Sequence, residues 1–184
     1  MNTIVTSRDD ILRTSRELLH QQGWTALHIR DVAAACGVSV GSIYNYFGSK
    51  AELTGAVVES VWREIFCPET DTPCGDIQAC VVWLYQRMEY AATAYPGFFA
   101  LHSVGFPAAE KAEGTKLMHR AWQHILDQLC DVLEHDPKIR PGAFQEGFTP
   151  SVFADLLFSL LLSALFRKDY DPKPVLEIIR RSLY

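Results

Sequence analysis

Apolar residues recur along most of this chain with the spacing of an α-helix rather than that of a β-strand. Ile11, Leu12, Ser15, Leu18 and Leu19 share one helical face, and the same spacing returns over residues 77–95 and 118–132. No segment alternates apolar and polar residues for long enough to predict a sheet. The spacing therefore predicts an all-α fold.

Residues that begin and end helices divide this pattern into segments. Ser39 stands at an N-cap position, Ser49 and Glu52 form a capping box, and Thr149-Pro150 is typical of a helix start. Gly23 and Gly37 are typical C-terminal glycines. Nine helices are expected: one ended by Gly23, then about 29–36, 40–46, 50–66, 77–95, 97–105, 107–135, 150–167 and 172–184.

Charge is distributed unevenly over the 184 residues, whose formal net charge is −5. Residues 1–50 carry five basic and four acidic side chains, whereas the rest of the chain is strongly acidic. A protein that coats nucleic acid along its whole surface is therefore excluded, but a near-neutral head can still approach a polyanion. We expect a DNA-binding domain over residues 1–50 and a helical ligand-binding and dimerisation domain over residues 51–184.

The cysteines and the most apolar segment indicate in which cellular compartment the protein is located. Five cysteines without a CxxC pair favour a reducing cytosol over a disulfide framework or a zinc ribbon, and no signal peptide is recognisable before Arg8. The run from Val152 to Phe166 is shorter than a membrane span and is interrupted by polar residues, so we expect a helix buried in protein. A cytoplasmic location is predicted.

The stretch from Ile29 to Lys50 predicts a helix-turn-helix. Two short helices meet at Cys36-Gly37-Val38-Ser39, a turn of the length and glycine content of that motif. A small core is expected to hold the two helices together, formed by Val32, Ala33, Val38, Ile43 and Phe47.

The second helix would then present small or hydrogen-bonding side chains to a major groove. Tyr44 and Tyr46 offer hydroxyl groups and Lys50 offers a positive charge to backbone phosphates. The alternative is a three-helix packing module in which Tyr44 is half-buried and Tyr46 has no functional role.

These motifs resemble the DNA-binding head of TetR-type transcriptional repressors. The resemblance rests on Gly23-Trp24, Ile29 to Ala33, Gly37-Val38-Ser39, Ile43 to Phe47 and Lys50 to Leu53, and it covers about 50 residues. Beyond residue 54 the chain agrees with that family only in the length, number and order of its expected helices.

The resemblance implies roles for individual residues. It makes Val40–Tyr46 the recognition helix, with bases or nearby backbone contacted by Ser39, Val40, Gly41, Ser42 and Asn45, and phosphates held by Tyr44, Tyr46 and Lys50. Where the family usually has a hydroxyl residue before Ile29, this chain has Leu27 and His28. His28 is a candidate substitute through a ring nitrogen.

The acidic body is rich in large aromatic residues, which either pack as a core or line an apolar cavity for a small molecule. The residues predicted to contact a ligand are Trp62, Phe66, Trp83, Arg87, Tyr90, Phe98, Phe99, His102, Met118 and Trp122. The apolar helix 150–167 and the last helix predict a two-fold interface, which the resemblance makes a four-helix bundle. Its candidate residues are Ser159, Leu160, Ser163, Phe166 and Ile179.

We therefore predict a transcriptional regulator rather than an enzyme, with no cofactor and no metal. Gly37-Val38-Ser39-Val40-Gly41 matches the nucleophile elbow of hydrolases, but that elbow requires a preceding strand and a sheet. The resemblance implies a homodimeric repressor that binds a pseudo-palindromic operator and is released by a small apolar or aromatic effector. The competing hypothesis is a helical enzyme or carrier that uses the head for protein contacts.

Overall fold

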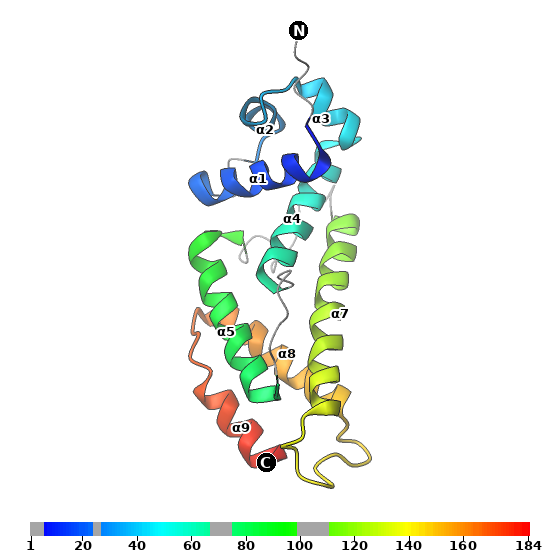
Figure 1. The fold of residues 1–184 in the computed structure, drawn as a ribbon, viewed down its shortest axis with the longest axis vertical. Helices are drawn as coiled ribbons and strands as arrows, with labels where there is room; N and C mark the ends of the chain where they lie inside the picture. The colour runs from blue at the N-terminus through cyan, green and yellow to red at the C-terminus, as the bar shows by residue number, and fades with distance from the viewer. Residues whose placement is uncertain (1–5, 24–26, 67–74, 99–110) are drawn as a thin grey trace. The chain divides into compact units, whose positions relative to one another are not determined.

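The computed structural model describes residues 6–23, 27–66, 75–98 and 111–184, with residues 111–121 described as helical backbone only. These residues contain helices and no strand, apart from one isolated bridge between Gln145 and Phe148. The helices are α1 (Arg8–Gln22), α2 (Ile29–Ala35), α3 (Val40–Tyr46), α4 (Lys50–Phe66), α5 (Ile77–Ala94), α7 (Lys111–His135), α8 (Pro150–Arg167) and α9 (Lys173–Leu183) (Figure 1). The all-α prediction is confirmed.

The predicted count of nine helices is one more than the eight of the described residues. The helix expected over Gly97–Gly105 lies mainly within residues 99–110, outside the described part of the chain. The predicted limits of the other helices agree with those observed to within a few residues.

Local capping explains where these helices begin and end. Ser7, Ser39 and Thr149 each accept a hydrogen bond from a backbone amide three residues ahead, at 3.0, 3.0 and 3.3 Å. Gly23 ends α1 with a φ of 74° and donates its amide hydrogen to Leu19. Side-chain oxygens thus satisfy amide groups that a helix start leaves without partners.

The chain forms two compact units, Met1–Glu64 with Ala91–Met118, and Ile65–Tyr90 with His119–Tyr184. In the first unit α2 packs against α1 and α3 (Figure 1). The core beneath this packing includes the apolar residues Ile11, Val32, Ile43 and Phe47, each buried.

The second unit contains most of α5, the C-terminal part of α7, and α8 and α9. Trp122 of α7 meets Phe158 of α8 edge to face, with ring centroids 5.7 Å apart. The buried Asp136 carboxylate joins three segments, because it accepts hydrogen bonds from the amide of Ile77 at 2.9 Å and the hydroxyl of Tyr184 at 2.5 Å. Both of these donors bond to Oδ2, and Oδ1 accepts a hydrogen bond from the amide of Lys138 at 2.8 Å. This burial is tolerated because both carboxylate oxygens have donors.

Helix α8 is the one helix of the described residues that is long and apolar enough to cross a membrane by length and composition, with 33% of it buried in the structure. A core or interface helix passes the same test, and this helix carries buried and exposed apolar residues on opposite faces.

Candidate nucleic-acid interface

Helix α3 has one buried face and one open face. Ile43 and the following Phe47 are fully buried, whereas Gly41, Tyr44 and Asn45 are exposed. The hydroxyl of Ser39 caps the helix through the amide of Ser42. The helix therefore presents the predicted surface, with its N-terminal end open to solvent.

Gly41 has no internal reason to be glycine. A Cβ built there would come no closer than 3.6 Å to Ser39 Oγ, which is ordinary contact, and its φ is not positive. Glycine inside a helix costs about 1 kcal/mol relative to alanine. Packing within the described part of the domain therefore does not require glycine at this position.

Tyr46 has a second role that the sequence did not indicate. Its hydroxyl donates a hydrogen bond to the carbonyl oxygen of Thr6, 2.5 Å away, and so ties the end of α3 to the segment before α1. A tyrosine hydroxyl has one hydrogen to donate. A phosphate contact from Tyr46 would therefore have to replace this bond, whereas the exposed Tyr44 hydroxyl is directly accessible.

The turn after α3 orders the start of α4. The amide of Glu52 donates to Ser49 Oγ at 3.0 Å, and Glu52 Oε2 accepts from the amide of Gly48 at 2.9 Å. Lys50, at the first position of α4, is exposed. Its ammonium group and the positive end of the helix dipole therefore lie together.

His28 occupies the N-cap position of α2 without making a side-chain cap. The predicted loss of a hydroxyl cap is confirmed, and the exposed imidazole remains available to a partner outside the protein.

Comparison with known proteins identifies this region. Residues 11–57 match the family model described as bacterial regulatory proteins of the tetR family. This part of the chain is therefore similar to the DNA-binding region of TetR-family regulators. The chain is 46% identical along 46 residues to the HTH-type transcriptional regulator AlkX of Mycobacterium tuberculosis. It is 34% identical along 55 residues to the HTH-type transcriptional repressor Rv3405c of the same species.

These matches cover 25% and 30% of this chain, and the chain spans only 22% and 29% of the two relatives' length. Both relatives are named as HTH-type transcriptional regulators, which is the class of protein predicted from the sequence. The similarity in fold extends further along the chain than the similarity in sequence. The crystal structure of reduced NemR from Escherichia coli aligns over 96% of this chain and 97% of its own, with a TM-score of 0.68 and 19% identity.

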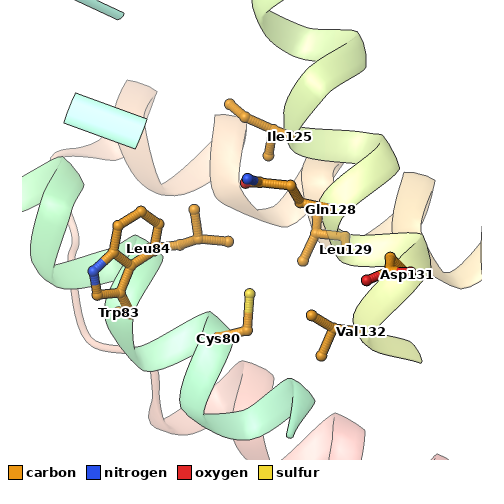
Figure 2. A pocket seen from close by; sticks show the side chains of 8 residues that line it. All are labelled: Cys80, Trp83, Leu84, Ile125, Gln128, Leu129, Asp131 and Val132. Atoms are coloured by element: carbon orange, nitrogen blue, oxygen red, sulfur yellow. The ribbon is translucent and has the colours of Figure 1, made fainter. Parts of the chain in front are cut away.

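The second unit contains a groove of about 280 Å³ between α5 and α7. Figure 2 shows the Cys80 sulfur and the Gln128 amide directed into the space between the two helices. Its lining is mainly apolar and consists of Cys80, Trp83, Leu84, Ile125, Gln128, Leu129, Asp131 and Val132.

Among the predicted ligand residues whose side chains the structure describes, Trp83 alone lines this groove. Trp62 and Phe98 are instead buried against each other in the first unit, with ring centroids 5.8 Å apart. Arg87 lies over the Tyr90 ring, and its Nε donates to the Ile65 carbonyl oxygen at 2.7 Å. Phe66 is also buried, and Trp122 packs on Phe158.

The remaining predicted ligand residues are not placed. Phe99 and His102 lie outside the described residues, and the side chain of Met118 is not described. The sequence did not predict the other groove residues, because they come together only when α5 and α7 lie side by side in the folded protein. Ile125 and Leu129 belong to the apolar helical face predicted over residues 118–132. The spacing of apolar residues did not indicate that Cys80 and Leu84 face them.

The candidate interface residues divide between two environments. Ser159, Ser163 and Phe166 are exposed and Leu160 is half-buried, so α8 presents them to solvent. Ile179 is 0% exposed and packs within its own subunit, which corrects its assignment to an interface. The exposed apolar residue of α9 is its neighbour Ile178.

Two of the described cysteines, Cys36 and Cys130, have thiols of reduced reactivity. Burial raises the pKa of the Cys36 thiol above its ordinary value. Burial and the Glu134 carboxylate raise the pKa of Cys130 in the same direction. Thiolates, the reactive form, are therefore disfavoured at both positions. Cys67 and Cys74 lie outside the described residues.

Proposed function

We propose that this protein is a ligand-responsive transcriptional repressor that binds a pseudo-palindromic operator as a homodimer. The observation that carries the proposal is the open face of α3, where Gly41, Tyr44 and Asn45 are exposed above a buried apolar face. A helix of this kind admits base contacts at its N-terminal end, and flanking hydroxyl and ammonium groups hold phosphates.

Dimerisation is supported by an apolar stripe on α8. Val152, Leu156, Ser159, Ser163 and Phe166 are exposed and alternate in steps of four and three residues. This is the spacing of a helix that packs lengthwise against another helix. Two serines in the stripe allow close approach of the partner helix, and each head of the dimer would read one half-site.

A small effector is supported by the groove between α5 and α7. At about 280 Å³ it suits a small molecule, and Trp83, Leu84 and Ile125 provide apolar contact. Gln128 and Asp131 supply the polar contacts. The effector would release DNA only if it binds the DNA-free arrangement more tightly.

Substitution of Lys50 tests the DNA-binding proposal. The probe is a duplex that the wild-type protein selects from a random-sequence pool, with binding measured by fluorescence anisotropy at several salt concentrations. Lys50→Ala is expected to weaken binding to selected and random duplexes alike, and to reduce the salt slope by about one unit, because phosphate contacts carry no sequence information.

Lys173→Ala is the matched control, since it removes the same charge from an exposed position at the start of α9. Equal affinities and salt slopes for both variants and the wild type would contradict the proposed surface.

A further inference from the structure

Glu64, near the end of α4, brings together side chains from three segments of the first unit. Its Oε2 lies 2.7 Å from Arg16 Nε, and its Oε1 lies 3.8 Å from His20 Nε2. Both partners belong to α1. The Tyr95 hydroxyl, just beyond α5, donates a hydrogen bond to the same Oε1 at 2.8 Å.

These contacts are partly shielded from water. The side chains of Arg16 and Glu64 retain 25% and 33% of their exposure, and Tyr95 is buried. The Tyr95 ring also contacts the His20 ring, with centroids 4.1 Å apart. Hydrogen bonds to a charged group are stronger than neutral ones, and more so where solvent is partly excluded.

The other end of α1 is joined to the recognition helix. The Tyr46 hydroxyl bonds to the Thr6 carbonyl oxygen at 2.5 Å, and the Arg8 guanidinium lies over the Phe47 ring, 5.1 Å from its centroid. Helix α1 is therefore held at its N-terminal end by the end of α3 and towards its C-terminal end by Glu64.

We propose that Glu64 is a positioning residue for DNA binding, which holds α1 through Arg16 and His20 and is itself oriented by the Tyr95 hydroxyl. The inference rests on the proposed function, since its readout is operator affinity. Affinity then depends on Tyr95, a residue remote in sequence from the DNA-binding domain.

The direction in which DNA affinity changes when Glu64 is neutralised distinguishes a positioning role from a purely electrostatic one. Removing a negative charge from a DNA-binding protein reduces its repulsion of phosphates and strengthens binding. If Glu64 positions α1, neutralising it weakens binding instead. Glu59→Gln makes the same change at an exposed position of the same helix and reports the electrostatic effect alone.

The experiment measures affinity for the duplex selected by the wild-type protein, at one salt concentration, together with thermal unfolding to show that each variant is folded. We expect Glu64→Gln to weaken binding about ten-fold and Tyr95→Phe about three-fold, from the usual strength of such hydrogen bonds. The double variant should lose little more than Glu64→Gln alone, because both changes remove one coupled interaction.

A charge exchange tests whether the pair itself matters. Arg16→Glu combined with Glu64→Arg restores the attraction, and the Tyr95 hydroxyl can accept from the new guanidinium. Binding should recover towards that of the wild type, whereas either single change should weaken it. Failure of the folded exchange variant to recover, or a Glu64→Gln variant that binds as tightly as Glu59→Gln, would overturn the proposal.

A measurement without DNA separates this inference from the proposed function. Hydrogen exchange of the α1 amides should be faster in Glu64→Gln than in Glu59→Gln. If the wild-type protein selects no duplex, the proposed function fails, while the exchange measurement still decides whether Glu64 holds α1. Equal exchange in the two variants would overturn the positioning role.

Discussion

At the scale of single residues, Ser39 combines two roles that different substitutions can separate. Its hydroxyl accepts the Ser42 amide and so caps α3, and it stands at the end of the helix that we place against DNA. Because both roles use one exposed side chain, loss of activity alone would not distinguish a damaged helix from a lost contact.

Ser39→Asp keeps a capping oxygen and adds a negative charge. We expect thermal stability close to that of the wild type, measured by circular dichroism, with a large loss of DNA affinity. Ser39→Ala removes the cap and should cost about 1 kcal/mol of stability. An aspartate variant that binds DNA as well as the wild type would show that this end of α3 lies away from the phosphates.

At the scale of elements, α8 has two apolar faces, one buried within the subunit and one exposed to solvent. Leu157 and Leu161 are buried within the subunit, whereas Leu156 and Phe166 are 50% and 61% exposed. Solvated apolar residues in one stripe along a helix indicate a partner surface. A charge introduced on either face therefore has a different consequence.

We expect Leu156→Arg to give a folded monomer, measured by analytical ultracentrifugation, because an unpaired charge disfavours an apolar interface. Leu161→Arg places the same charge in the subunit core and should unfold the protein. Ala79→Arg, at an exposed position of α5, is the control and should leave the oligomeric state unchanged. A stable dimer carrying Leu156→Arg would place the interface elsewhere.

At the scale of the whole molecule, the boundaries of the two compact units differ from the domain boundary expected at residue 50. The first compact unit includes Ala91–Met118 as well as the helix-turn-helix, because Tyr95 and Phe98 pack with residues of α1 and α4. The division into a DNA-binding and a ligand-binding domain remains a prediction about function. Substitution of two tryptophans of the second unit tests the prediction that this unit binds a ligand.

Trp83 and Trp122 are both half-buried, but Trp83 lines the groove and Trp122 packs on Phe158. We expect Trp83→Ala to change stability little and to abolish stabilisation by any compound that protects the wild type in a thermal-shift screen. Trp122→Ala should cost more stability than Trp83→Ala, because it removes the edge-to-face contact with Phe158. A Trp83→Ala variant that is still stabilised by the same compound would exclude the groove as its binding site.

The sequence by itself determined what depends on neighbours along the chain. Caps at Ser7, Ser39 and Thr149, the glycine at position 23 and the helical spacing of apolar residues act within one turn, so helix limits and the open face of α3 followed from them. The tertiary structure decided which apolar residues meet. Trp62 and Phe98 pack against each other, Ile179 lies in the core, and Glu64 contacts residues up to 48 positions away in the sequence. The sequence did not predict these contacts, because they depend on how whole helices pack.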